Sequence, residues 1–211
     1  TFSSLWHLAR RIRLTSSNVR CVPKKPTTDC TRAAQSLINP SFTGNAATRH
    51  GRTFEPVARA AFASQTALTV TPSGTVVCSD HPWLSASPDG LLEDIDALLE
   101  IKCPHLDNVW DLMPTKNYDI QTINGELRLS PTGVNGYYSH VQFAMFCCKK
   151  NNAFLYLWSA KGKINVIVPY DQQYVEDNFP RLRKFYFTEM LPRVQVMHKQ
   201  GKFHVTRQYA R

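Results

Sequence analysis

Apolar residues recur along the chain at two different spacings, which distinguish predicted helices from predicted strands. An apolar residue at every third or fourth position indicates an amphipathic helix, whereas a short apolar run bounded by turn residues indicates a strand. Helical spacing is found in residues 5–13, 30–38, 46–65, 139–149 and 171–190. Short apolar runs are found in residues 67–71, 76–78, 83–86, 98–101, 153–159 and 164–168. The chain therefore mixes helices with short strands.

Proline and turn residues indicate where these elements begin, bend or end. Pro56 predicts a break or a fresh start within the third helix, and Pro180 predicts a kink in the last one. Asp171 is suited to cap the beginning of that last helix. Asn124-Gly125 is a dipeptide typical of a tight β-turn, and it predicts a hairpin over residues 120–129.

The distribution of charge indicates what kind of partner the chain has. The net charge is +9 and the pI is near 9.4. This balance favours a polyanion, with nucleic acid ahead of an acidic membrane surface. Residues 1–59 hold ten Lys and Arg but two acids, whereas residues 60–101 hold six acids and no Lys or Arg. An acidic centre within a basic chain suits a metal-dependent enzyme that acts on phosphodiesters.

Length and cysteine content place the chain in a broad class. A length of 211 residues suits a single domain over residues 1–211. The six cysteines form no CxxC pair and no zinc-binding pattern, and the first residues lack the apolar core of a signal peptide. No uncharged run is apolar enough to cross a bilayer. We therefore expect reduced thiols, no membrane segment and an intracellular protein of the nucleus or cytoplasm rather than a secreted one.

The candidate chemistry lies around residue 100. Glu100 and Lys102 are two positions apart on a predicted strand, so their side chains project to the same face. Asp89 lies on a predicted Pro-Asp-Gly turn that would bring it back beside this strand. Two carboxylates and an ammonium among apolar neighbours suit a bound Mg²⁺ or Mn²⁺, with the lysine orienting and helping to deprotonate a water molecule. The plainer alternative is a hairpin with an ordinary ion pair.

These residues also match a family pattern. Ser87-Pro88-Asp89-Gly90, followed by Leu98-Leu99-Glu100-Ile101-Lys102-Cys103-Pro104, resembles the core of the PD-(D/E)XK nucleases, and more narrowly that of the YqaJ-like viral recombinases of the phage lambda exonuclease type. The resemblance implies an α/β (α+β) fold with a restriction-endonuclease-like core, in which helices flank a central mixed β-sheet. It also implies that Asp89, Glu100 and the carbonyl of Ile101 bind Mg²⁺, with Mn²⁺ as a substitute.

Two weaker matches in the first 60 residues extend the resemblance. Gly51-x-x-x-Glu55 resembles the family motif whose glutamate approaches the metal, although a single helical glutamate more often faces solvent. Trp6-x-x-x-Arg10 followed by Leu14-Thr15-x-Ser17 resembles the segment that holds the terminal phosphate of the DNA. For Arg10 and Ser17 the alternative is a solvated basic face with a serine cap.

The resemblance also implies roles for Ser87 and Gln142 in holding that phosphate. Gln142 is followed after three residues by Phe146, where the family motif has tyrosine, so any contact made by that hydroxyl is in doubt. The alternative for Gln142 is a surface residue on a core helix. Within the single domain, the pattern divides the chain into a phosphate-binding helix and loop (residues 1–45), a catalytic core (46–170) and a C-terminal helix with a basic tail (171–211).

The resulting hypothesis is a Mg²⁺-dependent 5′-to-3′ exonuclease that digests double-stranded DNA from ends carrying a 5′-phosphate, of the kind used in recombination by viruses and mobile elements. An endonuclease on DNA or RNA with the same core is the first alternative, because this fold supports many cleavage modes. A non-catalytic DNA-binding module is the second. The resemblance also allows a homo-oligomer and a partner protein that anneals single strands.

Overall fold

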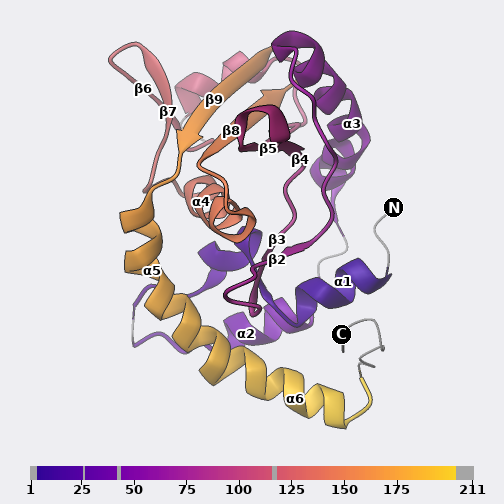
Figure 1. Ribbon diagram of the computed structural model, residues 1–211, viewed down its shortest axis with the longest axis vertical. Coiled ribbons are helices and arrows are strands. Elements are labelled where there is room, and N and C mark those ends of the chain that lie inside the picture. Colours follow the sequence, from indigo (N-terminus) through magenta and orange to yellow (C-terminus); the bar gives the residue numbers. More distant parts are fainter. Residues whose placement is uncertain (1–3, 26, 42–43, 116–117, 203–211) are drawn as a thin grey trace.

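The computed structural model describes residues 4–25, 27–41, 44–115 and 118–202, and a four-stranded mixed sheet lies at its centre (Figure 1). Its order is β4-β5-β8-β9. The strands are β4 (Gly90–Leu92), β5 (Ala97–Lys102), β8 (Asn152–Trp158) and β9 (Lys163–Pro169). β5 and β8 run parallel, while β4 and β9 are antiparallel to their neighbours. The predicted α/β fold with a central mixed sheet is confirmed.

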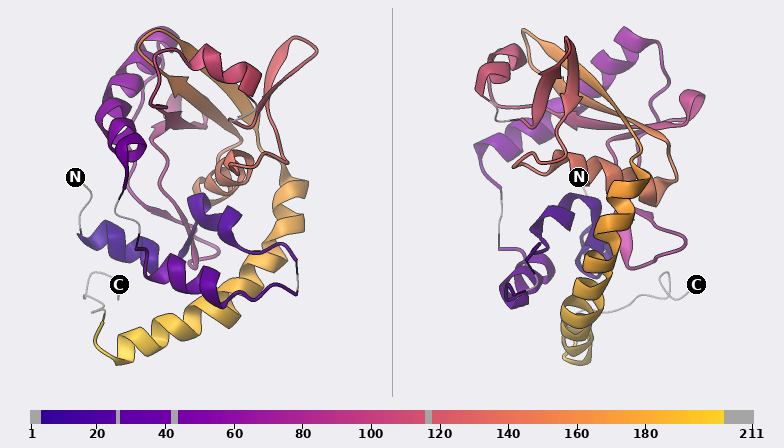
Figure 2. Two further views of the ribbon diagram at one scale, coloured as in Figure 1. Left: turned by 180° about the vertical axis from the view of Figure 1, so that it is seen from behind. Right: turned by 90° about the vertical axis from the view of Figure 1, so that its left-hand side faces the viewer.

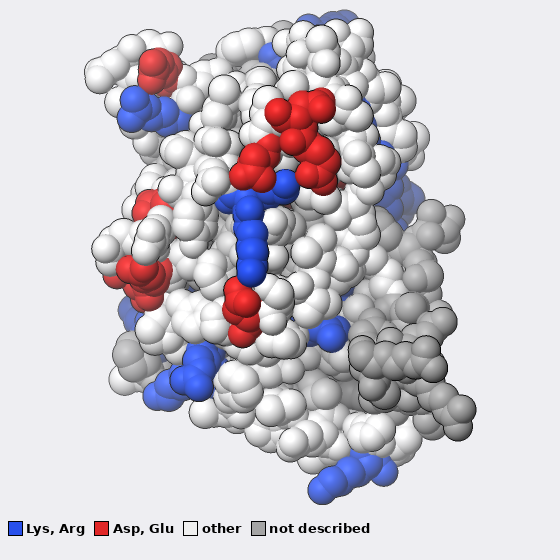
Figure 3. All heavy atoms as spheres, viewed as in Figure 1, with Lys and Arg blue, Asp and Glu red and all other residues white. Residues whose placement is uncertain are grey.

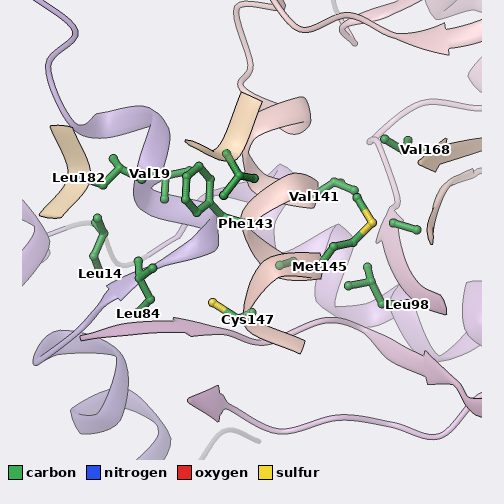
Figure 4. Packing of buried hydrophobic residues seen from close by; sticks show 14 of the residues in the cluster. Leu14, Val19, Leu84, Leu98, Val141, Phe143, Met145, Cys147, Val168 and Leu182 are labelled. Carbon is green, nitrogen blue, oxygen red and sulfur yellow. The ribbon is translucent and has the colours of Figure 1, made fainter. Parts of the chain in front are cut away.

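Two helices cover opposite faces of this sheet, namely α3 (Ala46–Thr66) and α4 (Tyr137–Cys148). Successive side chains of a strand point to opposite faces. Accordingly Leu99 of β5 packs in the cluster that includes Phe62 of α3, and Leu98 packs in the cluster that includes Val141 and Met145 of α4 (Figure 4). Glu100 alternates with Leu99 and therefore shares the α4 face of the sheet with Leu98.

The remaining elements form two smaller sheets and a helical layer. The first small sheet has the order β1-β3-β2 and the second is the hairpin β6-β7. These strands are β1 (Leu14–Thr15), β2 (Val76–Val77), β3 (Leu84–Ala86), β6 (Ile120–Ile123) and β7 (Glu126–Leu129). The helices are α1 (Ser4–Arg11), α2 (Thr31–Ile38), α5 (Gln172–Phe185) and α6 (Leu191–Lys199), with 3₁₀ turns at Ser16–Cys21, Glu93–Ile95 and Val109–Thr115. Figure 2 shows α5 and α6 as one long rod that passes beside α2.

Several local predictions are confirmed by the backbone. Asn124 and Gly125 both have positive φ, 53° and 82°, as the tight turn of a β-hairpin requires. Oδ1 of Asp171 accepts the N–H of Tyr174 at 2.9 Å and so caps α5. Among the described residues no helix has both the length and the apolarity needed to cross a bilayer.

The strand assignments on either side of Asp89 need correction. Residues 67–71 are not a strand, since α3 continues to Thr66 and only an isolated bridge joins Thr71 to Leu91. Gly90, predicted as part of the Pro-Asp-Gly turn, is instead the first residue of the strand β4. The chain reverses after it, in the acidic segment 93–96, and Asp89 therefore lies at the beginning of a strand rather than on a turn.

The predicted break or fresh start at Pro56 is wrong. α3 continues through Pro56, whose side chain is exposed, because Phe62 and Ala58 on its inner side pack against the sheet. α5 likewise continues through Pro180. The irregularity in the C-terminal rod lies later, as a π-helical turn at Tyr186–Met190 just before Pro192. Pro192 has no N–H to donate, and its ring crowds the preceding turn of the helix. The wider π-helical turn at Tyr186–Met190 gives the ring room.

Candidate active site

Asp89 is held against the central strand by main-chain hydrogen bonds. Its N–H donates to the carbonyl of Leu99 at 3.0 Å, and its Oδ2 accepts the N–H of Ile101 at 2.6 Å. These bonds exist because β4 pairs with β5, with Gly90 opposite Leu99. A side chain at Gly90 would lie 2.4 Å from a methyl group of Val70, so the close approach of these segments requires glycine there. The structure thus brings Asp89 beside the Glu-x-Lys strand.

Glu100 and Lys102 lie on the face of β5 that α4 covers. The side chain of Glu100 is only 5% exposed, and the ammonium of Lys102 donates to its Oε1. Nδ1 of His140, on α4, lies 3.4 Å from the same oxygen. The ring of Tyr137, also on α4, faces Lys102 with its centroid 5.4 Å from Nζ. Two carboxylates and an ammonium therefore converge at the end of β5, as the sequence predicts.

Burial and mutual repulsion shift the proton affinities of these acids. Burial, followed by the charge of Glu100, raises the pKa of Asp89 to about 7. The pKa of Glu55 is also raised, by burial and then by the charge of Asp89. Burial alone would lower the pKa of Lys102, but Glu100 and Asp89 reverse this and the net shift is upward. The structure therefore places Lys102 as a hydrogen-bond donor to Glu100, and its part in deprotonating a water molecule stays a prediction.

A cavity of about 480 Å³ opens over these groups. Glu55 and Gly51 of α3 line one side of it, and Tyr137 lines another. Arg59, one turn after Glu55 on α3, bonds Oε1 of Glu55 and donates from Nε to the carbonyl of Asp89 at 2.9 Å. Glu55 therefore lines the cavity, as predicted. Arg59, for which the sequence indicated no role, links Glu55 to Asp89.

The donor set of this cavity fits a hard divalent cation. Carboxylate and carbonyl oxygens are the ligands that Mg²⁺ and Mn²⁺ prefer. Asp89 and Glu100 are buried together at a cost that a cation would offset, and the raised pKa of Asp89 records that cost. Within the described segments, however, no three His, Cys, Asp or Glu side chains are close enough to form a complete metal cage. The fit therefore depends on two carboxylates together with main-chain and solvent oxygens.

The acids of the turn before β5 lie outside the cavity. Nζ of Lys150 is 3.2 Å from Glu93 and 3.0 Å from Asp96, and Asp94 accepts the N–H of Thr69. Figure 3 shows acidic side chains gathered on the outer surface with basic ones beside them. These acids form a polar turn on the surface rather than a part of the site.

Arg10 organises a second polar cluster. Its two terminal nitrogens donate to Oγ of Ser17 at 2.9 Å and to Oγ of Ser87 at 3.1 Å. The hydroxyls of Thr15 and Thr75 extend the cluster, at 3.0 Å from Ser17 and 3.2 Å from Ser87. β1 and β3 pair in parallel and place these segments side by side. The structure thus unites three of the predicted phosphate-binding residues.

This hydroxyl cluster lies next to the carboxylates. Burial lowers the pKa of Arg10, and the charge of Glu100 acts in the opposite direction, which requires the two groups to be near each other. His140 lies between the clusters: its pKa is held well below the usual value by burial and then by Lys102, Arg10 and Arg20. An anion held by Arg10 would consequently lie beside the acidic pocket.

Gln142 is placed elsewhere. Its side chain is fully buried, its Nε2 donates to the carbonyl of Pro169 at 2.9 Å and its Oε1 accepts the N–H of Asp171 at 2.8 Å. Both ends of the amide therefore join α4 to the segment between β9 and α5. The structure therefore does not bring Gln142 together with Arg10, Ser17 and Ser87, and its phosphate contact stays a prediction.

His140 is a residue of the site that was not predicted from the sequence, although helical spacing points to it. Tyr137 and His140 are three residues apart, so they share one face of a helix, whereas Gln142 lies about 200° around the helix from His140. Once Tyr137 is known to face Lys102, helical spacing identifies His140 as the next residue on that face.

Comparisons with known proteins agree with this geometry. Searching curated protein sequences gives no match. Among solved structures, an alkaline exonuclease (LHK-Exo) from Laribacter hongkongensis superposes with a TM-score of 0.70 at 21% identity, covering 95% of this chain and 98% of that one. The same enzyme in complex with dAMP gives 0.68 at 22% identity, covering 95% and 99%.

A phage-related exonuclease from Haemophilus somnus 129PT gives a TM-score of 0.60 at 14% identity, covering 82% of this chain and 93% of that one. At these identities the likeness establishes a shared fold. The sequence profile of the YqaJ-like viral recombinase domain matches residues 5–151, which span both polar clusters and the strands β4 and β5 of the central sheet. The chain therefore belongs to the YqaJ-like viral recombinase family.

Proposed function

We propose that this protein is a metal-dependent 5′-to-3′ exonuclease that digests double-stranded DNA during recombination. The convergence of Asp89, Glu100 and Lys102 in one cavity, beside the cluster around Arg10, carries this proposal. Family membership and the alkaline exonuclease fold support it. The net charge of +9 suits a polyanionic substrate.

The cation is proposed to be Mg²⁺, with Mn²⁺ as a substitute, because the available donors are hard oxygens. Asp89, Glu100 and the carbonyl of Ile101 would hold it, with Glu55 assisting from α3. A bound cation supplies Lewis-acid activation of water and neutralises charge that develops on the phosphate. Lys102, as an ammonium, orients the attacking water and stabilises the same charge.

The cluster around Arg10 is proposed to hold the 5′-terminal phosphate. A guanidinium and serine hydroxyls are suited to phosphate oxygens, because Arg offers two parallel N–H donors and Ser a short O–H donor. Ser17 and Ser87 already lie at hydrogen-bonding distance from Arg10. With the phosphate fixed there, the next phosphodiester of the strand would reach Glu100 and Lys102, which favours cleavage from an end.

The deciding experiment uses a linear duplex with labelled 5′-phosphorylated ends and, in parallel, a covalently closed circle. We expect mononucleotide release from the linear duplex with Mg²⁺ or Mn²⁺, and none with EDTA. Cleavage of the circle would instead establish an endonuclease. Binding of the duplex without any cleavage under all metal conditions would establish a DNA-binding module and overturn the proposal.

The assembly that acts on DNA is a separate part of the proposal. A homo-oligomer that encircles the substrate, or a partner that anneals the exposed single strand, would suit a recombination exonuclease. Light scattering of the chain with and without duplex DNA measures the first of these. A mass that stays at one copy per duplex end would exclude the oligomer.

A further inference from the structure

His140 and Lys102 approach one and the same oxygen of Glu100 from two different elements. Lys102 comes from β5 itself, and His140 comes from α4, which covers that face of the sheet. Nδ1 of His140 is 3.4 Å from Oε1 of Glu100, and the histidine side chain is 14% exposed. The imidazole is therefore a largely enclosed neighbour of the acid.

The chemistry of the contact defines the direction of the interaction. A carboxylate oxygen accepts hydrogen bonds, so the interaction open to this 3.4 Å contact is one in which Nδ1 of His140 donates. This holds whether or not the other ring nitrogen is protonated. The imidazole is therefore placed to donate to Glu100, whereas the ammonium of Lys102 already forms such a bond.

Oε2, the second oxygen of Glu100, makes no hydrogen bond or ion pair with the described residues. Every hydrogen bond and ion pair that the Glu100 side chain makes with the described residues falls on Oε1. The bond from Lys102, with a second donor placed 3.4 Å from the same oxygen, would orient the carboxylate plane and leave Oε2 available. A carboxylate restrained in this way is prepared to offer Oε2 to a cation.

We propose that His140 is a positioning residue that keeps Glu100 oriented for the cation when Lys102 turns its ammonium toward water and phosphate. This inference rests on the proposed function, because it assigns a role within the same site. Lys102 has three ammonium hydrogens to divide among Glu100, the attacking water and the phosphate, so it does not hold Glu100 alone throughout the reaction. His140 then keeps the carboxylate of Glu100 oriented, and it contacts neither water nor phosphate in this role.

The test measures cation binding directly, without DNA or turnover. Mn²⁺ is titrated into the full chain by calorimetry, and free Mn²⁺ is followed by electron paramagnetic resonance. We expect His140→Ala to raise the Mn²⁺ dissociation constant about 10-fold, the lower end of what loss of a supporting partner costs a metal site. In steady-state assays the same variant should require more Mn²⁺ for half-maximal rate, while KM for DNA stays unchanged.

Two amide variants separate positioning from simple packing. His140→Asn places an N–H donor where Nδ1 lies, so we expect its Mn²⁺ affinity to stay close to that of the wild type. His140→Gln places the donor where Nε2 lies, away from Glu100, so it should bind Mn²⁺ as weakly as His140→Ala. His198→Asn is the matched control, because His198 is exposed on α6. It should leave Mn²⁺ affinity unaltered.

A double-mutant cycle with Lys102→Met adds a second readout. Since both residues hold the same oxygen, His140→Ala should weaken Mn²⁺ binding more in the Lys102→Met background than in the wild type. Equal Mn²⁺ affinity of the wild type and His140→Ala would overturn the inference, and so would equal losses for the Asn and Gln variants. Absence of Mn²⁺ binding by the wild type would instead overturn the proposed function, so the two failures are distinguishable.

Discussion

The backbone N–H of Ile101 donates a 2.6 Å hydrogen bond to Oδ2 of Asp89. Ile101 lies between Glu100 and Lys102, so this bond ties Asp89 to the centre of the Glu-x-Lys strand. The bond reaches across from the beginning of β4 to β5, and Arg59 holds the carbonyl of the same aspartate from α3. These hydrogen bonds therefore hold Asp89 at a defined place beside Glu100 and Lys102, so a change at one of these residues affects both stability and activity.

Replacing Asp89 by Asn should stabilise the metal-free protein in a pH-dependent way. The ordinary pKa of Asp89 is 3.8 and its pKa in the folded protein is about 7. The folded state thus binds this proton more tightly than the unfolded state. Stability from this group is present at pH 4 and is lost as the pH rises to 7. Asp89→Asn removes the buried charge and should raise the free energy of unfolding above pH 7 by about 1–3 kcal/mol.

Thermal melting in EDTA between pH 5 and pH 8.5 measures this effect of Asp89→Asn. The melting temperature of the variant should exceed that of the wild type most at the alkaline end, and the difference should shrink toward pH 5. Added Mg²⁺ should stabilise the wild type more than the variant. A difference that is constant across the pH range would show that Asp89 titrates normally.

Removing the ammonium of Lys102 should abolish catalysis while sparing DNA binding. Lys102→Ala loses the donor that orients water and stabilises charge on the phosphate, so we expect the hydrolysis rate to fall about 10²- to 10³-fold. Affinity for duplex DNA, measured by fluorescence anisotropy in Ca²⁺, should remain within about threefold of the wild type because many other basic groups contact the backbone. Cleavage by this variant at the wild-type rate would eliminate the proposed role of Lys102.

Arg10→Lys should reduce discrimination between DNA ends. Lysine keeps the positive charge but cannot span Ser17 and Ser87 with two N–H donors, as Arg10 does. The preference for a 5′-phosphate over a 5′-hydroxyl end should therefore fall about 10-fold, in competition assays with both duplexes. Arg11→Lys is the control, because Arg11 bonds the carbonyl of Ile38. An unchanged preference in Arg10→Lys would place the terminal phosphate elsewhere.

Gln142→Leu should destabilise the protein without impairing the chemistry of the folded fraction. The substitution leaves the carbonyl of Pro169 and the N–H of Asp171 without their partner, at a cost of about 1–3 kcal/mol in the free energy of unfolding. Urea denaturation measures the loss of stability, and single-turnover digestion at low temperature measures the chemistry. A variant of normal stability that binds DNA ends poorly would show that Gln142 contacts the substrate after all.

The local features of this protein could be predicted from spacing along the chain. Alternation along a strand put Glu100 and Lys102 on one face, helical spacing located α3 and α4 closely, and Asn124-Gly125 marked the hairpin. Such features depend on neighbours within a few residues, so periodicity and turn chemistry reveal them. The family pattern added the order of the motifs.

Contacts between residues that are distant in sequence could not be predicted in this way. The pairing of β4 with β5, the bridge from Arg59 to Asp89 and the approach of His140 to Glu100 all depend on how elements pack, which no local spacing encodes. The orientation of α4 is the clearest case. Its inner face carries Tyr137 and His140 to the pocket and directs Gln142 to Pro169, because a helix can turn only one side toward the end of β5.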